Sequence, residues 1–426
     1  MTFFLILIAL VLVLFTGIPV FTALTLFAAA ILFGVEGNLG NLGEIVFGKL
    51  NTYLLVAIPL FTLMAHFMIR GRVVDDLYAT AHILLRHLPG GLGIATVAAC
   101  TIFAAISGSS VATALTIGSA AIPQMLRYGY NPRTAYGVVG AGGTLGILIP
   151  PSAPMVLFGV VSDTSIGQLF MAGVIPGLLV ALIFALYCMW SAHGRTAERL
   201  PRARLGEALA AIRRSIWALS LPPLILGGMY FGVFTATEAA GVGALAALLI
   251  ALLAYRSLGI RGICEAARDA ARTSAMLFMI LIGAALFGHV LTKLRIPQQM
   301  VELVTTYGVS QIEFLIAVMV LVFVLGMFLE TISIILITTP VVLPALVALD
   351  INPVWYGVLL TINLELALIT PPVGMNLFAI KAITKAPIGE IIVGIAPYVV
   401  LLVAGLGMVM AFPELALWLP GTMIGR

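Results

Sequence analysis

Long apolar stretches fill most of the chain, and short polar or glycine- and proline-rich stretches separate them. Because a membrane-spanning helix needs about 20 apolar residues, this pattern predicts an all-α polytopic membrane protein with about ten to twelve transmembrane helices. Residues 2–34 predict one long kinked helix or two short ones, because Gly17-Ile18-Pro19 interrupts them. Further spans are expected near 51–70, 166–193, 215–233, 235–255, 274–292 and 388–412.

Two apolar stretches of the first half are interrupted near their centres. Residues 91–127 contain Ser107-Gly108-Ser109-Ser110, and they are too few for two full crossings, which need about 40 residues and a loop. They therefore predict a re-entrant hairpin, which turns inside the membrane and leaves on the side where it entered. Residues 134–162 predict a broken span, because glycines, prolines and a serine occupy much of 142–152.

The second half repeats this order. Residues 311–349 predict a second hairpin, interrupted at Glu330-Thr331, and residues 354–380 predict a second broken span. Paired broken helices at matching positions are typical of a transporter whose binding site lies near the bilayer midplane. We predict two repeats, which are inverted if each half crosses the membrane an odd number of times. One constant spacing along the chain relates Pro123, Asn131-Pro132 and Pro150-Pro151 to Pro344, Asn352-Pro353 and Pro371-Pro372.

Polar segments separate and flank these apolar stretches. The most polar one, 194–214, is rich in arginine, and the positive-inside rule places it in the cytoplasm. We divide the chain into a first repeat (1–200), a basic cytoplasmic linker (201–214) and a second repeat (215–426). Residues 35–50 are expected to form a polar loop. Amphipathic segments in the membrane interface are expected at 73–90, 256–272 and 293–308.

The composition agrees with a membrane protein. The chain is 62% hydrophobic and 9% charged, against about 25% charged residues in soluble domains. Cys100, Cys188 and Cys264 are too widely spaced to indicate a disulfide framework, and the five histidines show no paired ligand spacing for a transition metal. No Walker A sequence and no nucleic-acid footprint are present, so we expect no cofactor. The first helix lacks a basic region before it and is expected to be retained rather than cleaved.

The broken stretches suggest a chemistry for the interior. A helix that breaks inside a membrane leaves backbone N–H and C=O groups that protein, water or a ligand must satisfy. Around 142–152 and 370–374, freed carbonyls and nearby hydroxyls make an all-oxygen environment that suits Na⁺. The N-termini of half-helices carry partial positive charge, which suits a carboxylate. The alternative is packing, since glycine and proline also occur at ordinary helix contacts. The duplication of the breaks favours a binding site.

Three glutamates lie in otherwise apolar sequence, where a charged side chain is costly and should face protein or a cavity. Glu330 falls at the tip of the second hairpin and could be a site residue or a structural partner. Glu238 is expected to cap a scaffold helix, and Glu365 fits either role. His66 and His289 are expected to be structural residues rather than proton relays.

At these motifs the sequence resembles the large membrane subunit of the TRAP transporters, the DctM type. The resemblance covers essentially the whole chain in order, and the motifs are specific when taken together. One departure is Ala236, where the family often has proline, in the scaffold part of the chain. The motifs that carry the resemblance are Ser107-Gly108-Ser109-Ser110-Val111-Ala112, Gly129-Tyr130, Gly146-Ile147-Leu148-Ile149-Pro150-Pro151-Ser152, Phe234-Thr235-Ala236-Thr237-Glu238-Ala239-Ala240, Phe328-Leu329-Glu330 and Thr370-Pro371-Pro372-Val373-Gly374.

The resemblance implies a secondary transporter driven by a Na⁺ gradient. Its substrate would be an organic acid such as a C4-dicarboxylate, sialic acid or a related carboxylate. The motion would be of the elevator type, in which a transport domain with both hairpins and both broken helices moves against a scaffold. The expected partners are a small four-helix membrane subunit of the DctQ type and a periplasmic substrate-binding protein of the DctP type. The expected location is the bacterial inner membrane.

The resemblance also implies which residues form the site, and none of them is catalytic. Two Na⁺ sites are expected, one at each hairpin tip with its broken span, and the substrate would lie between the tips. The expected substrate-binding residues are Ser107, Gly108, Ser109, Ser110, Thr144, Glu330, Thr331 and Asn376. The expected Na⁺ ligands are Ser107, Ser110, Gly146, Ile149, Pro151, Thr331, Thr370, Pro371 and Gly374.

Other functions remain as alternatives. The nearest is a stand-alone Na⁺/dicarboxylate or citrate carrier that works without partner subunits. A channel is a different class, and paired re-entrant hairpins fit alternating access better. A membrane enzyme would need a nucleophile–base pair or a metal-ligand spacing, which the sequence does not offer. With the basic linker inside the cell, Lys381 and Lys385 would also lie inside and the C-terminus outside.

Overall fold

The computed structural model describes residues 2–37, 39–192 and 201–424. The described residues contain helices, turns and loops and no β-strand, which confirms the all-α prediction. The helices of the first half are α1 (Thr2–Phe15), α2 (Val20–Glu36), α3 (Leu42–Leu50), α4 (Ala57–Arg70), α5 (Val73–Leu85), α6 (Gly91–Ser107), α7 (Ser110–Arg127), α8 (Pro132–Leu148), α9 (Ala153–Ser162) and α10 (Ile166–Ser191). Those of the second half are α11 (Leu205–Tyr230), α12 (Ala236–Leu249), α13 (Ile260–Lys293), α14 (Ile296–Tyr307), α15 (Gln311–Gly326), α16 (Thr331–Ala348), α17 (Pro353–Leu368), α18 (Met375–Thr384), α19 (Ile388–Ala411) and α20 (Glu414–Gly421).

Within the described chain, 8 segments are long and apolar enough to cross a membrane. They are Tyr53–Arg70, Pro132–Ser162, Ile166–Ser191, Leu205–Tyr230, Ala236–Ala254, Ile260–Lys293, Thr331–Ala348 and Ile388–Ala411. This makes the chain a multi-pass membrane protein, with fewer long spans than the sequence suggested. The expected spans 2–34 and 354–380 are not among them, because their helices α1, α2, α17 and α18 are only 14, 17, 16 and 10 residues long.

Two segments expected outside the helical core belong to helices. The expected loop 35–50 contains α3, whose side packs against α13. Most of the expected interfacial segment 256–272 and the whole span 274–292 belong to one continuous helix, α13 (Ile260–Lys293), of 34 residues. The early part of α13 already buries Ala266 and Ala270, so its arginines do not mark a separate interfacial helix.

The expected linker is shorter than the sequence indicated. Residues 193–200 of the polar segment lie outside the described residues, and residues 205–214 form the first turns of α11. Arg86 donates a hydrogen bond to Glu207 at 2.8 Å, which holds these turns beside the end of α5. The amphipathic segment 73–90 does contain a helix, but the apolar face of α5 is buried against α6 and α11.

The backbone bends at matching positions in the two halves. Arg72 and Arg295 both adopt the left-handed conformation, with φ of 54° and 55°, immediately before α5 and α14. Asp163 and Lys385 do the same at the ends of α9 and α18, with φ of 55° and 56°. The two residues of each pair lie 223 and 222 positions apart. Such conformations are uncommon for non-glycine residues, so their recurrence supports a structural repeat.

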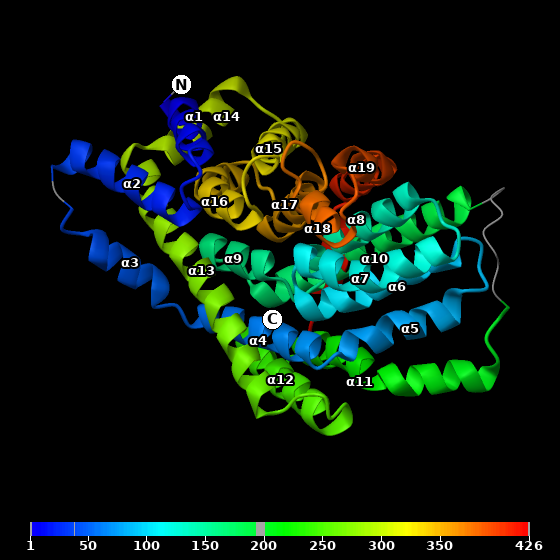
Figure 1. Ribbon diagram of the computed structural model, residues 1–426. Helices are drawn as coiled ribbons and strands as arrows, with labels where there is room; N and C mark the ends of the chain where they lie inside the picture. The colour runs from blue at the N-terminus through cyan, green and yellow to red at the C-terminus, as the bar shows by residue number, and fades with distance from the viewer. Residues whose placement is uncertain (1, 38, 193–200, 425–426) are drawn as a thin grey trace.

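Helices of each repeat pack against helices of the other repeat. The second arm of each hairpin contacts the second half of the other repeat's broken helix, since α7 packs on α18 and α16 packs on α9. The same exchange relates the scaffold, where α12 packs on α4 and α2 packs on α13. Figure 1 shows α13 running obliquely across the molecule, from α2 and α16 at one end to α4 at the other. That the two repeats are inverted relative to a membrane stays a prediction.

Candidate functional site

The first hairpin tip is a small network of hydroxyl and carbonyl oxygens. Helix α6 ends at Ser107, Gly108 turns the chain with φ of 59°, and the Ser109 hydroxyl caps α7 by accepting from the Ala112 N–H at 3.3 Å. The hydroxyls of Ser107 and Thr113 share a hydrogen bond of 2.9 Å. Thr113 also donates to the Ser109 carbonyl oxygen at 2.8 Å. The tip is therefore held by its own side chains.

This tip is seated in the break between α8 and α9. A methyl group at Gly146 would lie 2.8 Å from the Ser110 backbone nitrogen and closer still to the Ser109 carbonyl. A methyl group at Gly108 would lie 2.5 Å from the Pro151 carbonyl oxygen. Only glycine allows the tip to approach the broken helix this closely. Beyond the break, the Ser152 hydroxyl caps α9 by accepting from the Met155 N–H at 3.3 Å.

The second tip is joined to its own broken helix through the backbone. Helix α15 ends at Gly326, and the Met327 carbonyl accepts a hydrogen bond of 3.2 Å from the Val373 N–H in the break between α17 and α18. Glu330 precedes α16 in an extended conformation and makes no side-chain cap. The Thr370 hydroxyl donates to the Leu366 carbonyl at 2.7 Å.

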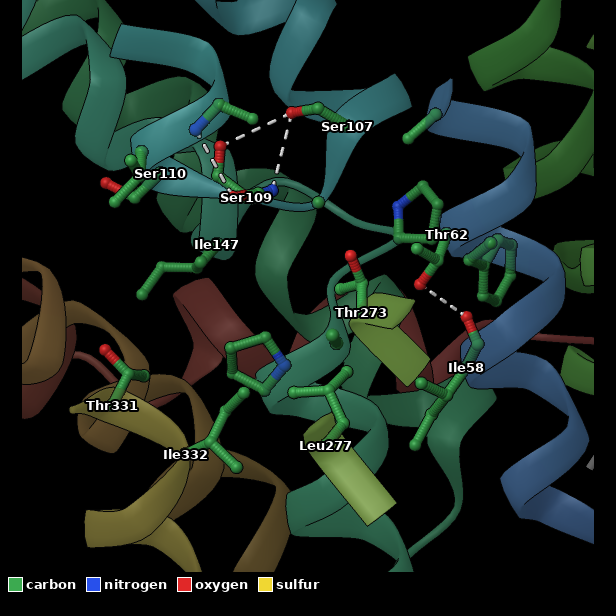
Figure 2. A pocket seen from close by; sticks show the side chains of 18 of the residues that line it. Ile58, Thr62, Ser107, Ser109, Ser110, Ile147, Thr273, Leu277, Thr331 and Ile332 are labelled. Atoms are coloured by element: carbon green, nitrogen blue, oxygen red, sulfur yellow. Dashed lines mark hydrogen bonds between the residues drawn. The ribbon is translucent and has the colours of Figure 1, made fainter. Parts of the chain in front are cut away.

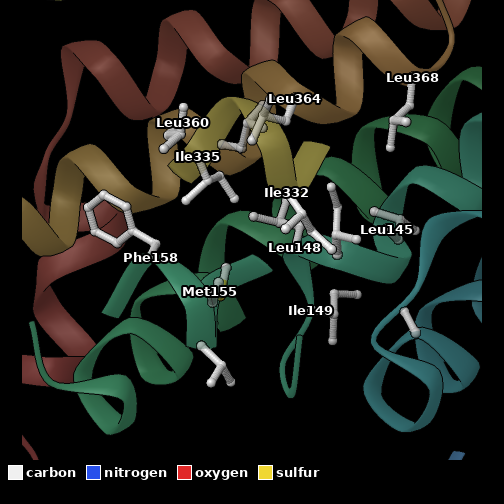
Figure 3. Close-up of a cluster of buried hydrophobic side chains, with 14 of the residues drawn as sticks. Leu145, Leu148, Ile149, Met155, Phe158, Ile332, Ile335, Leu360, Leu364 and Leu368 are labelled. Carbon is white, nitrogen blue, oxygen red and sulfur yellow. The ribbon is translucent and has the colours of Figure 1, made fainter. Parts of the chain in front are cut away.

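A shared apolar cluster holds the two halves together beneath the tips. Figure 3 shows Leu148, beside the first break, on the side of Ile335 of α16 and Leu364 of α17, whereas Ile149 and Met155 pack on Gly177 and Gly173 of α10. These side chains are buried, with at most 6% of their surface exposed. Burying such side chains stabilises a fold by about 1.5–3 kcal/mol each. The cluster packs the first broken helix against α10, α16 and α17.

Both tips and both broken helices meet at one cavity of about 300 Å³. In Figure 2, Ser107 and Ser109 lie on one side of this cavity and Thr331 and Ile332 on another, while Thr62 enters from α4. Of the predicted site residues, those that line the cavity are Ser107, Gly108, Ser109, Ser110, Pro151, Glu330 and Thr331.

Helix ends of both polarities reach this cavity. The first residues of α7, α9, α16 and α18 line it, and these N-termini present backbone N–H groups and partial positive charge. The last residues of α6 and α17 line it as well, and these C-termini present carbonyl oxygens. The cavity can therefore hold a carboxylate beside a monovalent cation. Among the described residues, no group of three His, Cys, Asp or Glu side chains could hold a transition metal.

The remaining predicted residues do not reach the cavity surface. Asn376 is fully buried, and its side-chain amide donates to the Ser110 hydroxyl at 2.8 Å and to the Gly140 carbonyl at 3.3 Å. Thr144 is also fully buried, and its hydroxyl donates to the Ala141 carbonyl at 2.6 Å within α8. Direct substrate contact by these two residues is therefore not supported in this conformation. The predicted Na⁺ ligands set back from the described cavity lining are Gly146, Ile149, Thr370, Pro371 and Gly374.

The scaffold supplies lining residues that sequence reasoning missed. Thr62 and His66 reach the cavity from α4, and Thr273 reaches it from α13. Thr62 lies within an ordinary apolar span, and Thr273 falls between the expected segments 256–272 and 274–292, so neither hydroxyl indicated a site. His66 was expected to be structural, and its place in the cavity wall leaves its role open to test. The recurrence of His66 as His289 at the repeat spacing was the available hint.

Glu238 and Glu365 differ from Glu330 in their surroundings. Glu238 forms a capping box at the start of α12, in which its carboxylate accepts the Thr235 N–H at 2.9 Å. This confirms the capping role expected from the sequence. Glu365 is fully buried in α17, outside the described lining of the cavity.

Comparisons with known proteins give a consistent picture. A family model described as "Tripartite ATP-independent periplasmic transporter, DctM component" matches residues 7–415. The C4-dicarboxylate TRAP transporter large permease protein of Pseudomonas aeruginosa is 42% identical over 368 residues, which cover 86% of each chain. The ectoine TRAP transporter large permease protein of Halomonas elongata is 35% identical over 402 residues, which cover 94% of each chain.

One solved structure shares the fold at low sequence identity. The YdaH transporter of Alcanivorax borkumensis superposes with a TM-score of 0.62 and 15% identity, over 88% of each chain. At this identity the likeness concerns the fold alone.

Proposed function

The chain belongs to the DctM component family of the tripartite ATP-independent periplasmic transporters, and from this membership we propose that it drives Na⁺-coupled uptake of an organic acid. It is a large permease of the TRAP type and not an enzyme. The observation that carries the proposal is the meeting of both hairpin tips and both broken helices at one cavity. That arrangement supplies carbonyl oxygens and helix N-termini to the same small space.

The first Na⁺ would bind where the first tip enters the break of α8 and α9. Its ligands would come from the Ser107 and Ser110 hydroxyls and from backbone carbonyls of Gly146, Ile149 and Pro151. This region already gathers oxygen atoms, because the Pro151 carbonyl lies against Gly108 and the Ser109 carbonyl lies against Gly146. Oxygen ligands of this kind suit a hard monovalent cation better than a transition metal.

The second Na⁺ would bind at the second tip, held by Thr331 and by the backbone around Thr370, Pro371 and Gly374. The substrate carboxylate would lie between the tips, near Ser109 and Glu330. The N-termini of α7, α9, α16 and α18 would stabilise its negative charge. We assign Asn376 an indirect role, in which its amide orients the Ser110 hydroxyl.

The tripartite family description motivates two partners. We propose a small four-helix membrane subunit and a periplasmic protein that delivers the substrate, in a bacterial inner membrane. The two relatives described above are named for C4-dicarboxylate and for ectoine, both of which carry a carboxylate. The higher identity to the C4-dicarboxylate permease makes a dicarboxylate the first substrate to test. Transport would proceed by an elevator motion of the hairpins and broken helices against the scaffold.

Gentle purification from the native membrane, followed by mass spectrometry, tests this proposal first. We expect to recover a small membrane subunit in stoichiometric amount. The periplasmic binding protein that serves this complex would then be tested for binding of dicarboxylates. Uptake by reconstituted vesicles should require Na⁺, both subunits and the loaded binding protein. A chain that comes alone and transports alone would instead support the stand-alone carrier. Uptake that is unchanged when choline replaces Na⁺ would remove the coupling ion from the proposal.

A further inference from the structure

A second cavity of about 310 Å³ lies against α13, away from the hairpin tips. Lys49 of α3 and His289 of α13 bring cationic or titratable groups to it, and Thr292 adds a hydroxyl. The opposite wall comes from Leu336 and Pro340, on the arm of α16 beyond its tip. Neither the sequence motifs nor the proposed binding site accounts for this cavity.

The scaffold residues that line the two cavities occupy equivalent positions in the two repeats. The α4 residues that line the first cavity are Ile58, Phe61, Thr62, Ala65, His66 and Ile69. The α13 residues that line the second cavity are Leu281, Ala284, Ala285, Gly288, His289 and Thr292. Each α13 residue follows its α4 counterpart by the same number of positions, which is also the spacing that relates Arg72 to Arg295. The match covers every α4 residue in the described lining, so the two faces are structural equivalents.

The tip side of the first cavity differs from its α4 face, because it already contains counterpart residues from both repeats. Its lining contains pairs of residues that are each other's counterparts at the spacing that relates Pro150-Pro151 to Pro371-Pro372: Val111 with Ile332, Ile147 with Leu368, and Pro154 with Met375. Exchanging the two repeats would therefore leave the tips and breaks facing the cavity. The same exchange would replace the α4 face with the α13 face.

Helix α13 passes both cavities in turn. Thr273 and Leu277 line the first cavity, and the stretch from Leu281 to Thr292 lines the second. With a helical rise of about 1.5 Å per residue, the centres of these two stretches lie roughly 17 Å apart along the helix axis. A rigid-body shift of the hairpins along α13 by this distance would carry the tips from one cavity to the other.

We propose that the α13 face around His289 is the second scaffold wall of the substrate chamber, which the tips meet when they open to the opposite side of the membrane. This proposal rests on the proposed transport function. In inverted-repeat transporters, alternating access arises when one repeat takes up the arrangement of the other around a fixed site. In the state that is open to the opposite side, the tips would occupy the second cavity. Lys49 would there face the carboxylate, whereas the described lining of the first cavity contains no Lys or Arg.

Two pairs of cysteines test the equivalence directly. Thr62→Cys with Val111→Cys joins α4 to the first tip, and Ala285→Cys with Ile332→Cys is its counterpart on α13 and the second tip. Both pairs are introduced after Cys100, Cys188 and Cys264 are replaced, in native membranes, and treated with a short bifunctional thiol reagent in Na⁺ or choline medium. The first pair should be linked in the conformation described above. The second should be linked only after the tips have moved, so Na⁺ should change the two yields in opposite directions.

A matched control moves the α13 cysteine from Ala285 to Met279, which is exposed and lines neither described cavity. The pair Met279→Cys with Ile332→Cys should give no linked product in either medium. The proposal is overturned if Ala285 never links to Ile332 while Thr62 links to Val111, or if Na⁺ changes both yields in the same direction. Failure of the transport function would appear separately, as absent Na⁺-dependent uptake in the cysteine-replaced parent.

Discussion

The two hairpin tips occupy equivalent places in the fold but differ in chemistry and exposure. Around the first tip, Pro150, Pro151 and Ser152 are buried, whereas Pro372 and Val373 of the second break are exposed. The hydroxyls of the first tip bond to one another and to the backbone, and the second tip carries Glu330 without a capping bond. The repeat thus preserves the bends of the backbone and leaves the side chains free to diverge. We infer that the first half forms a tightly packed seat for its tip, whereas the second break is more exposed.

The strongest test of this difference between the two halves is to prevent the close approach of the first tip to its broken helix. Gly146→Ala should reduce Na⁺-driven uptake to background, because the added methyl group meets the backbone of Ser109 and Ser110 rather than a flexible side chain. Overpacking of this kind destabilises a fold by about 1–3 kcal/mol. Uptake and the Na⁺-dependent rise in melting temperature measure the loss.

The matched control is Ala367→Gly, at the counterpart of Gly146 in the second repeat. There the second repeat already holds a methyl group, because Gly326 of α15 makes room for it. We expect Ala367→Gly to lose about 1 kcal/mol of helix stability and to retain uptake. Equal losses in the two variants would show that the first seat is no tighter than the second.

The next largest effect is expected at the two tips, where one substitution removes a charge and its counterpart removes a helix cap. Glu330→Gln should lower uptake by about tenfold, which corresponds to about 1.4 kcal/mol, while leaving the melting temperature unchanged. Glu330 lines the cavity but makes no cap, so the amide removes only its charge. Its counterpart Ser109 does cap α7, and Ser109→Ala should cost about 1 kcal/mol of stability in addition to any loss of uptake. A melting temperature that falls equally in both variants would contradict this separation.

The breaks could be predicted from sequence because their causes are local. A proline pair lacks backbone donors, and glycine permits close approach, so the interruptions near 142–152 and 370–374 were visible without a structure. The hairpin tips were visible for the same reason, since Ser107 to Ser110 and Glu330 are polar residues in apolar surroundings. The structure brings these four interruptions to one cavity.

What sequence could not provide was which side chains face each other across the fold. Thr62 lies in a span that looks like any other apolar helix, and Thr273 lies between two expected segments. Their positions in the cavity depend on how α4 and α13 pack. Thr144 was chosen for its glycine-rich neighbours, yet its hydroxyl turns back into α8. The arginines early in α13 suggested an interface, whereas the alanines between them bury that stretch against the bundle. These outcomes depend on tertiary packing, which no local pattern encodes.

A third prediction concerns the one described side-chain bond that ties the first tip to the second repeat's broken helix. Asn376→Met copies the residue at the counterpart position, Met155, and leaves the buried Ser110 hydroxyl without this amide donor. Leaving a buried polar group unpaired costs about 1–3 kcal/mol. We expect a lower melting temperature and a several-fold higher Na⁺ concentration for half-maximal uptake.

A double variant distinguishes positioning from simple loss of packing. Because removing both partners of a buried hydrogen bond is nearly neutral, Ser110→Ala with Asn376→Met should recover much of the lost stability. Its Na⁺ dependence should remain weakened, since Ser110 is a proposed ligand. Full recovery of both properties would assign Asn376 to packing alone.

The smallest effect is expected at the scaffold, where an ion-pair cluster joins α4 to α13. Arg70 at the end of α4 binds Glu265 at 2.6 Å and also Asp269, both on α13. The pair is partly exposed, with 34% of the Arg70 side chain accessible, so solvent screens much of its attraction. A double-mutant cycle with Arg70→Met and Asp269→Asn should therefore give a coupling of about 0.5–1 kcal/mol, weakened further by high salt. Uptake should stay near the parent level, because α4 and α13 also pack directly on each other. A coupling well above this range, or a loss of uptake with normal stability, would mean that this ion pair helps to set the position of the scaffold walls and is more than a local brace.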